Sequence, residues 1–243
     1  MNKELIEEIK KKREFSELPD SIVDRAAEIA KGNVKESRAL LRKYFGVFLT
    51  NKVLKGKGDL LEAHMSSKKR DYSYFCKEIF EGVRDVGSVI DLGAGVNGFS
   101  YPYLKNVVGS VKYVAVEAAG QLVERMNDYF EKEGFNAEAV CLDLFDVDKI
   151  KKMLRCQIKD RVVFLFQVID ALENLERDFS KKFILEISKE CEWMVLSLPT
   201  ESLGGRKKFA VRRKWMIDFL EENFVIDKDF TSNGERILRF CKK

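Results

Sequence analysis

From Ser88 to the end of the chain, short apolar runs alternate with amphipathic stretches of 10 to 18 residues. This alternation is typical of β-strand–helix–β-strand units that build a parallel sheet, and it constrains the fold more than any other feature. We predict strands at 88–92, 111–117, 136–142, 161–167, 192–198, 224–230 and 235–241. We predict helices at about 98–106, 120–133, 146–156, 173–190 and 206–222. The second part of the chain is therefore expected to be an α/β domain.

The connection between the last two predicted strands contains Asn233-Gly234. This dipeptide favours the tight turn of a β-hairpin, so the final pair of strands is expected to be antiparallel. Five parallel strands closed by such a hairpin are the layout of a seven-stranded, Rossmann-like methyltransferase domain, which we assign to residues 87–243. A dinucleotide-dependent dehydrogenase usually continues its strand–helix alternation to the end, so the hairpin argues against that class.

Residues 1–86 are predicted to form a separate helical domain. Apolar residues recur near helical spacing there, as in Leu5, Ile6 and Ile9. We expect helices over about 2–15, 20–31, 35–54 and 67–84.

Positive charge is concentrated in the first third of the chain. Residues 1–87 hold 19 Lys and Arg against 15 Asp and Glu, whereas residues 88–243 hold 25 of each. Residues 31–70 alone carry 11 basic and three acidic side chains. Such a segment is either a solvated helix face or a surface that binds a polyanion such as RNA. The candidate RNA contacts are Lys35, Arg38, Arg42, Lys43, Lys68 and Lys69, with a second cluster at Arg206, Lys207, Lys208, Arg212 and Arg213.

Composition excludes several other classes of protein. The chain has 243 residues, 45% of them hydrophobic, but no apolar run approaches the roughly 18 residues of a membrane helix, and its start is charged. We therefore expect a cytoplasmic protein without membrane association, and a monomer. The five cysteines are scattered and there is one histidine, so neither a disulfide framework nor a metal site is expected.

Acidic residues end three successive predicted strands. Asp91 is followed by a turn in which Gly93 and Gly95 let the backbone approach a ligand, and Glu117 stands 26 residues later. A carboxylate at the end of the second strand, where Glu117 stands, is suited to accept hydrogen bonds from a ribose diol. Asp143, at the end of the third strand, is placed to accept from an adenine amino group. One acid at a strand end is often only a loop residue, but three acids at these spacings favour a binding site for S-adenosylmethionine.

That cofactor carries its own electrophile, so the protein needs no nucleophile for the reaction. The sequence is consistent with this, since it offers no serine–histidine–aspartate or cysteine–histidine set.

Four segments together resemble the 16S ribosomal RNA methyltransferases of the aminoglycoside-resistance type, which modify a guanine N7, and the chain looks like a divergent member. The segments are 60–70 (LLEAHMSSKKR), 88–97 (SVIDLGAGVN), 163–172 (VFLFQVIDAL) and 197–206 (SLPTESLGGR). The last is similar to the family's Ser-Phe-Pro-x-x-Ser-Leu-x-Gly-Lys/Arg stretch.

The resemblance implies roles for individual residues. Arg70 would bind the methionine carboxylate of the cofactor, the turn from Asp91 to Gly95 would pass beneath the methionine moiety, and Glu117 would bind the ribose. His64 would support the cofactor pocket, or merely form a hydrogen bond at the domain junction. The helical N-terminal domain would dock on the small ribosomal subunit, with 16S rRNA or the assembled subunit as partner.

The sequence departs from the family after the fourth strand. Where the resistance enzymes carry a Lys-x-Leu-Pro type sequence, this chain has Gln167, Val168, Ile169 and Asp170. A guanine N7 is already nucleophilic, whereas an exocyclic amine needs nearby acceptors for its proton. Gln167 and Asp170 are therefore candidate catalytic residues for a cytosine or adenine amino group, with Gln167 also beside the cofactor. Alternatively, Asp170 caps a helix, with Glu173 completing a capping box.

Two other functions stay open at this stage. A small-molecule or protein methyltransferase on the same fold would not need the basic extension. A non-catalytic RNA-binding relative would be expected to have a damaged cofactor site, yet Asp91, Gly93, Gly95 and Glu117 are all present. We therefore expect an S-adenosylmethionine-dependent rRNA methyltransferase.

Overall fold

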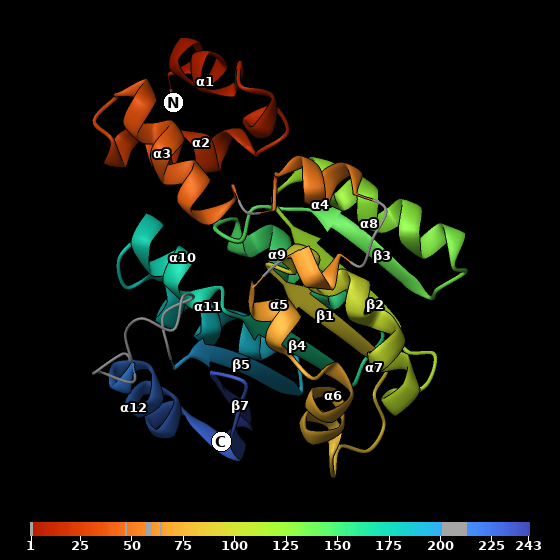
Figure 1. Ribbon diagram of the computed structural model, residues 1–243. Coiled ribbons are helices and arrows are strands. Elements are labelled where there is room, and N and C mark those ends of the chain that lie inside the picture. Colours follow the sequence, from red (N-terminus) through yellow and green to blue (C-terminus); the bar gives the residue numbers. More distant parts are fainter. Residues whose placement is uncertain (1, 47, 57–59, 64, 201–212) are drawn as a thin grey trace.

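The centre of the molecule is one seven-stranded sheet. The computed structural model describes residues 2–46, 48–56, 60–63, 65–200 and 213–243 (Figure 1). The strand order is β3-β2-β1-β4-β5-β7-β6. The strands β1 to β5 pair in parallel, and β7 pairs antiparallel with both β5 and β6. Their bounds are β1 Ser88–Leu92, β2 Lys112–Glu117, β3 Ala137–Cys141, β4 Arg161–Phe166, β5 Trp193–Pro199, β6 Phe224–Ser232 and β7 Glu235–Lys242. All seven predicted strands and the final hairpin are therefore confirmed.

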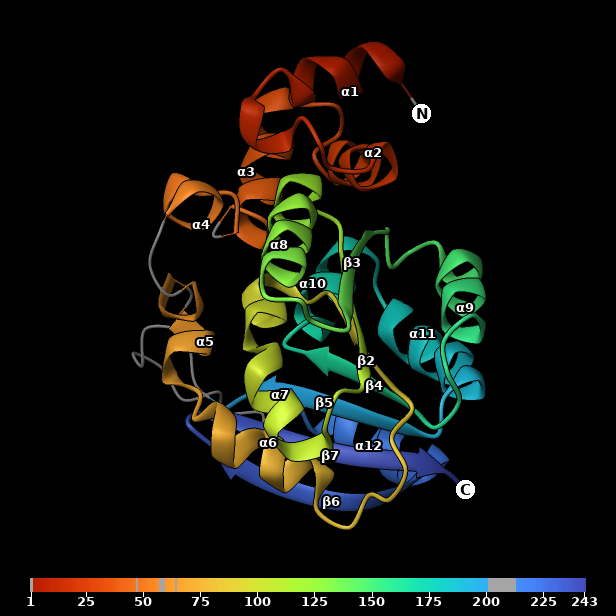
Figure 2. The ribbon, with the colours of Figure 1, turned by 90° about the vertical axis from the view of Figure 1, so that its right-hand side faces the viewer.

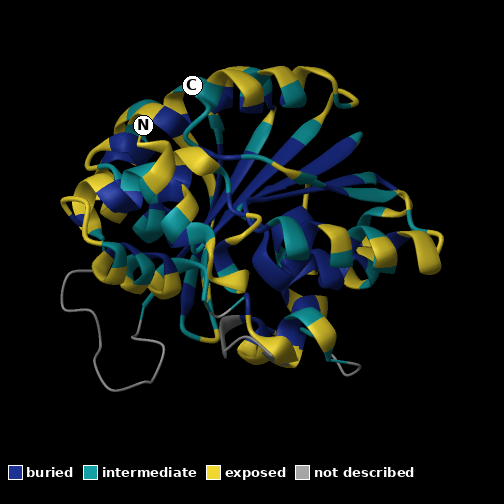
Figure 3. Cartoon of the chain, turned by 90° about the horizontal axis from the view of Figure 1, so that it is seen from above, coloured by how far each residue is buried: buried dark blue, intermediate teal, exposed yellow. Residues whose placement is uncertain are grey.

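Both faces of the sheet are covered at its centre, which explains why β1, β2, β4 and β5 are buried at almost every position. In β1, Val89 packs into a cluster with α6, α7 and α8, whereas Ile90 packs into a second cluster with α9, α11 and α12. Figure 2 shows α7 and α8 on one side of the sheet and α9 and α11 on the other. Seen from above, the central strands are buried between helices whose outer faces are exposed (Figure 3).

The first three helices of the sheet domain begin close to the predicted positions, the fourth is broken, and the part of the last one predicted over 206–212 lies outside the described residues. They are α7 Tyr101–Val108, α8 Gly120–Lys132, α9 Val147–Arg155, α10 Ile169–Leu175, α11 Phe179–Ile187 and α12 Lys214–Asn223. The single helix expected over 173–190 is wrong, because the backbone turns between α10 and α11 with Asp178 at φ 61°. Glu173 accepts hydrogen bonds from the backbone N–H of Asp178 and Ser180 and so caps α11.

The N-terminal helices are shorter than expected. They are α1 Lys3–Lys10, α2 Asp20–Ile29, α3 Val34–Tyr44, α4 Asn51–Lys55, α5 Met65–Lys69 and α6 Tyr72–Phe80. The helix expected over 35–54 divides into α3 and α4, where Thr50 caps α4 by accepting from the N–H of Val53. The helix expected over 67–84 divides at Arg70, because Asp71 caps α6.

Helices α1 to α3 form a small lobe at one end of the molecule (Figures 1 and 2). We call them, with the turn at Arg13–Phe15 (η1), the N-terminal lobe. Ser21 donates a hydrogen bond to Asp143, which follows β3, and Arg25 forms an ion pair with Glu176 after α10. Gln121 at the start of α8 donates to the carbonyl of Arg13. These contacts fix the lobe over the carboxyl ends of the strands.

Helix α6 packs directly on the sheet, although its sequence lies in the predicted N-terminal domain. Phe75 contacts Phe166 of β4 at a ring-centroid distance of 5.1 Å. The guanidinium of Arg239, in β7, donates to the carbonyls of Ile79 and Glu81. The change of sequence pattern at residue 87 therefore marks the start of the sheet, while packing against the sheet begins earlier in the chain.

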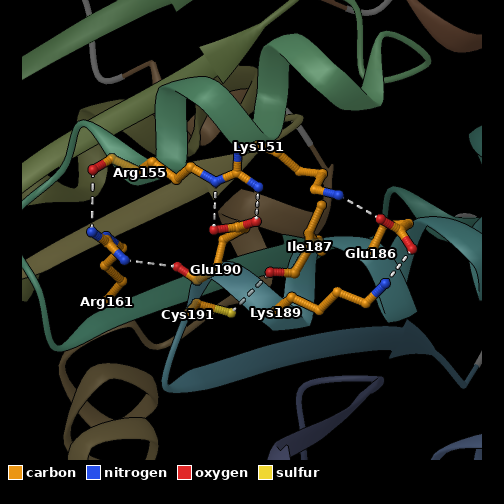
Figure 4. A network of polar contacts seen from close by, with 8 residues as sticks. All are labelled: Lys151, Arg155, Arg161, Glu186, Ile187, Lys189, Glu190 and Cys191. Atoms are coloured by element: carbon orange, nitrogen blue, oxygen red, sulfur yellow. Dashed lines mark hydrogen bonds and ion pairs between the residues drawn. The ribbon is translucent and has the colours of Figure 1, made fainter.

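An ion-pair network joins α9 to α11 and the short turn Ser188–Glu190 (η4) on the outer surface. Lys151 pairs with Glu186 at 2.5 Å, and Arg155 donates to both oxygens of Glu190 at 2.9 and 2.5 Å (Figure 4). The pairs hold Glu186 as an anion, and the pKa of its carboxyl falls to about 2 through hydrogen bonds from Lys151 and Lys189.

Among the described residues, no helix is long and apolar enough to cross a membrane.

Candidate active site

A cavity of about 390 Å³ opens at the carboxyl ends of the parallel strands. In open α/β sheets, ligands bind in the crevice outside the carboxyl ends of the strands, which is this edge. The N-terminal lobe contributes Ile22 and Lys43 to the wall, and the segment after α3 contributes Phe48. Of the predicted site residues, Lys43, Arg70, Gly93, Glu117, Asp143, Gln167 and Asp170 line this cavity.

The turn after β1 needs glycine for two reasons. Gly93 has φ 76° and Gly95 has φ 52°, angles that side chains with a Cβ rarely adopt. A Cβ on Gly93 would also lie 2.8 Å from Val168, and one on Gly95 would lie 2.7 Å from the ring of Phe48. Any other residue at either position would therefore strain the backbone and clash with a neighbouring side chain.

Glu117 ends β2 and holds this turn in place. One carboxylate oxygen accepts from the N–H of Gly95 at 2.9 Å, and the other accepts from Ala118 and Ala119 at 2.8 and 3.1 Å. Burial raises the pKa of Glu117, and these backbone donors partly offset the rise. Glu117 thus binds backbone as well as lining the cavity.

Asp91 lies beneath the cavity and does not line it. One of its oxygens accepts from Asn97 at 2.6 Å and from the hydroxyl of Tyr113 at 2.9 Å. The other, Oδ1, is buried without a hydrogen-bond partner among the described residues. Burial raises the pKa of Asp91 to about 6, against the two hydrogen bonds and the charge of Arg70.

Arg70 reaches the cavity from the end of α5. Its Nη2 donates to both oxygens of Glu235, at 3.0 and 2.7 Å, and its Nη1 donates to Asn97 at 3.1 Å. The guanidinium also lies 4.4 Å from the ring centre of Phe75. Burial lowers the pKa of Arg70, but the charge and hydrogen bond of Glu235, together with Tyr72 and Asp91, outweigh burial, so the pKa rises.

Asp143 links the third strand to the N-terminal lobe. One oxygen accepts from Ser21 at 2.5 Å and the other from the N–H of Phe145 at 2.9 Å. The Phe145 ring in turn contacts the guanidinium of Arg25, 4.2 Å from the ring centre. The acid predicted to meet an adenine amino group therefore also fastens the lobe.

Gln167 and Asp170 both line the cavity, but they are placed differently. Gln167 has φ 55°, and its N–H donates to the carbonyl of Ser197 at 3.2 Å. Asp170 forms an ion pair with Arg213, whose Nε donates to it at 2.8 Å. The capping-box alternative for Asp170 is wrong, because Val168 occupies the N-cap of α10 and Glu173 caps α11 instead.

The predicted RNA contacts divide into exposed and structural groups. Lys35, Lys43, Lys68 and Lys69 are exposed. Arg38 donates to the carbonyls of Ile9 and Glu8, so it holds α3 against α1. Arg42 is also exposed, but it pairs with Glu14 at 2.6 Å, and Arg213 pairs with Asp170. Five predicted site residues lie outside the described residues: His64, Arg206, Lys207, Lys208 and Arg212.

Glu235 and the ring of Phe48 are site residues that the sequence patterns above did not predict, and Asn97 had no predicted role. Strand alternation offers a signal for Glu235, because it places this residue on the same face of β7 as the buried Ile237. A carboxylate at an inward position predicts a buried cation nearby. Within the described part of the chain, no cluster of three or more potential metal ligands occurs.

No protein-family model matches the chain, and no curated protein matches its sequence. Among solved structures, the 16S rRNA methylase RmtB is similar with a TM-score of 0.72 and 15% identity, over 100% of this chain and 99% of that one. An rRNA methylase from Escherichia coli has a TM-score of 0.73 and 15% identity, over 99% of each chain. The 16S rRNA methyltransferase RmtF, in complex with S-adenosyl-L-homocysteine, has a TM-score of 0.73 and 16% identity, over the whole of both chains.

At these identities the likeness establishes the fold. The chain has the seven-stranded, Rossmann-like architecture of these methyltransferases, and the shared region includes its N-terminal helices. The predicted fold class is therefore confirmed.

Proposed function

We propose that this protein is an S-adenosylmethionine-dependent methyltransferase that modifies a base of 16S rRNA in the small ribosomal subunit. The observation that carries the proposal is the cavity at the carboxyl ends of the strands, where Arg70, Glu117 and Asp143 converge on a glycine turn. The fold, shared over the full chain with 16S rRNA methylases, supports the same conclusion.

The cavity residues suit this cofactor. Arg70 Nε is a buried donor without a partner among the described residues, which suits a carboxylate. Glu117 and Asp143 offer acceptors for a ribose diol and an adenine amino group, and Gly93 lines the same cavity. When bound, the cofactor would supply an electrophilic sulfonium methyl group, whose carbon forms a bond to the attacking nitrogen while the carbon–sulfur bond breaks and the sulfur leaves as a thioether. The chain itself binds and orients the reactants.

We propose guanine N7 as the target atom. Its lone pair is available without loss of a proton, so the reaction needs positioning more than a base. The ion pair with Arg213 favours this target, because Asp170 is already bound to a cation. An exocyclic amino group is the second candidate, since Gln167 and Asp170 both line the cavity and offer oxygen acceptors.

The exposed lysines of the N-terminal helices are proposed to bind the rRNA backbone. Lys43 both is exposed and lines the cavity, so a phosphate bound there would lie beside the reactive base. We expect the double variant Lys35→Gln/Lys43→Gln to bind small subunits more weakly and with a shallower dependence on salt, by about one to two units of the log–log slope. Lys132→Gln, which changes an exposed lysine on α8, is the matched control. An unchanged slope in the double variant would contradict this contact.

The function is tested by incubating the protein with labelled S-adenosylmethionine and purified small subunits, then identifying the labelled nucleoside by mass spectrometry. The expected product is 7-methylguanosine. An amino-methylated cytidine or adenosine would instead identify Gln167 and Asp170 as acceptors. Glu117→Ala, which removes the proposed ribose contact, should abolish labelling.

Absence of label in RNA would contradict the proposal. The same assay on extracts freed of RNA then tests the alternatives of a protein or small-molecule substrate. A protein that binds small subunits with full affinity yet labels nothing would be the non-catalytic relative.

A further inference from the structure

A buried ion pair links two elements that are far apart in the sequence. Arg70 follows α5, and Glu235 is the first residue of β7. Their side chains are only 5% and 6% exposed, and Arg70 Nη2 lies 2.7 Å from the nearer carboxylate oxygen. Burying two charges costs several kcal/mol that the attraction between them repays only in good geometry, so such a pair is weak evidence for stability alone. Its position beside the cavity offers another explanation.

The two partners lie differently with respect to the cavity. Arg70 lines it, and its Nε–H has no hydrogen-bond partner among the described residues. Glu235 does not line it, although β7 pairs at that point with Pro199, which does. Arg70 therefore lines the cavity with one donor still unused, and its counter-ion is not part of the cavity wall.

The anionic groups around Arg70 outnumber its single positive charge. Glu235 contacts it directly, and Asp91 acts on it through space and is joined to it through Asn97. Glu117 adds a third carboxylate at the cavity wall. A ligand with a lone carboxylate would gain the Arg70 hydrogen bond but would meet the field of these acids. A ligand that carries an ammonium group beside its carboxylate would satisfy both.

We propose that Glu235 is a positioning and specificity-determining residue, which holds Arg70 and offsets its charge so that the cavity prefers a zwitterionic amino-acid end to a plain carboxylate. The inference rests on the proposed function, in which the ligand is S-adenosylmethionine or its product.

The test compares two ligands that differ only in the ammonium group. They are S-adenosylhomocysteine and its deaminated analogue, which keeps the carboxylate and the whole nucleoside. By calorimetry the wild type is expected to bind S-adenosylhomocysteine more tightly. In Glu235→Gln this preference should fall about tenfold, because the cavity gains one positive charge, which favours the carboxylate-only ligand. A merely structural role would weaken both ligands equally.

Asp227→Asn is the matched control. Arg239 lies on the same strand, is as deeply buried as Arg70, and pairs with Asp227 of β6 while donating to the backbone at the end of α6. It does not line the cavity. This variant is expected to lower stability and to leave the ligand preference unchanged. Glu235→Asp, which keeps the charge, should retain a preference within about threefold of the wild type.

If Glu235→Gln does not fold, Arg70→Gln tests the charge balance from the other partner, because it removes the positive charge and keeps the surrounding acids. Its preference for the zwitterion over the carboxylate-only ligand should rise about tenfold. Equal losses for both ligands, or an unchanged ratio, would overturn the inference and leave the proposed function intact. A wild type that binds neither ligand would contradict the proposed function and the inference with it.

Discussion

Asp91 shows how one buried carboxylate couples the candidate site to pH. Its pKa is raised to about 6 by burial, from an ordinary value of 3.8. Between these two values the folded state holds a proton that the unfolded state has lost, so stability falls as pH rises through this interval. The acid that accepts hydrogen bonds from Asn97 and Tyr113 beneath the cavity is therefore maintained at a cost in stability near neutral pH.

We expect Asp91→Asn to remove this pH dependence. Lowering the pH from 7 to 5 should increase the wild-type free energy of unfolding, relative to that of the variant, by roughly 1 kcal/mol. Urea unfolding of both proteins at the two pH values measures the difference. Glu138→Gln, at a partly exposed position in β3, serves as the control and should follow the wild type. If the free energy of unfolding changed equally with pH in the wild type and in Asp91→Asn, the raised pKa of Asp91 would be refuted.

Gly93 is a second residue whose environment sets its identity. Gly93→Ala combines a left-handed backbone angle with a Cβ 2.8 Å from Val168, whereas Gly134→Ala has φ 61° and no atom within 4 Å. Both should lose about 1–2 kcal/mol of stability from the backbone angle. Only Gly93→Ala should weaken S-adenosylhomocysteine binding, by at least about tenfold. Calorimetry of the two variants separates the effects, and equal affinities would contradict the role of the turn.

At the scale of elements, the strands follow from the sequence more closely than the helices do. A strand such as β4 is apolar because both faces are covered, and this pattern is readable without the structure. The break between α10 and α11 cannot be predicted from the sequence in this way, because the apolar spacing typical of a helix continues through it. It depends on Glu173, whose carboxylate caps α11 from within α10.

Glu173→Ala should therefore destabilise the protein by about 1–2 kcal/mol through loss of the cap. Thermal unfolding followed by circular dichroism gives the change. Glu131→Ala removes an exposed carboxylate on α8 and is expected to stay within about 0.5 kcal/mol of the wild type. A loss for Glu173→Ala no larger than that of this control would contradict the capping role.

For the whole molecule, the attachment of the N-terminal lobe decides the shape of the candidate site. The lobe supplies Ile22 and Lys43 to the cavity wall, and it is held by Ser21 on Asp143 and by Arg25 on Glu176. The ion pair is partly exposed and contributes less than about 1 kcal/mol, while the hydrogen bond contributes about 1 kcal/mol. These polar contacts are weak enough to be removed without unfolding the sheet.

Ser21→Ala/Arg25→Ala is expected to loosen the lobe. Amide hydrogen exchange in α1 to α3 should become about tenfold faster, with exchange in β1 and β4 unchanged, because the sheet keeps its own core. Affinity for S-adenosylhomocysteine should fall in the same variant. Lys10→Ala/Asp20→Ala breaks an ion pair within the lobe at 2.6 Å and provides the comparison. Uniformly faster exchange through the sheet would contradict a local effect.

The sequence by itself determined the seven strands, the closing hairpin, the glycine turn and the acids at three successive strand ends. These follow from local patterns, because residue period, turn chemistry and strand ends are set by neighbours in the chain. Only the tertiary structure decided which partners those residues take. Arg70 meets Glu235 across 165 positions, and Ser21 meets Asp143 across 122. Such pairings depend on how elements pack, and a buried charge is stable only where packing brings it a partner.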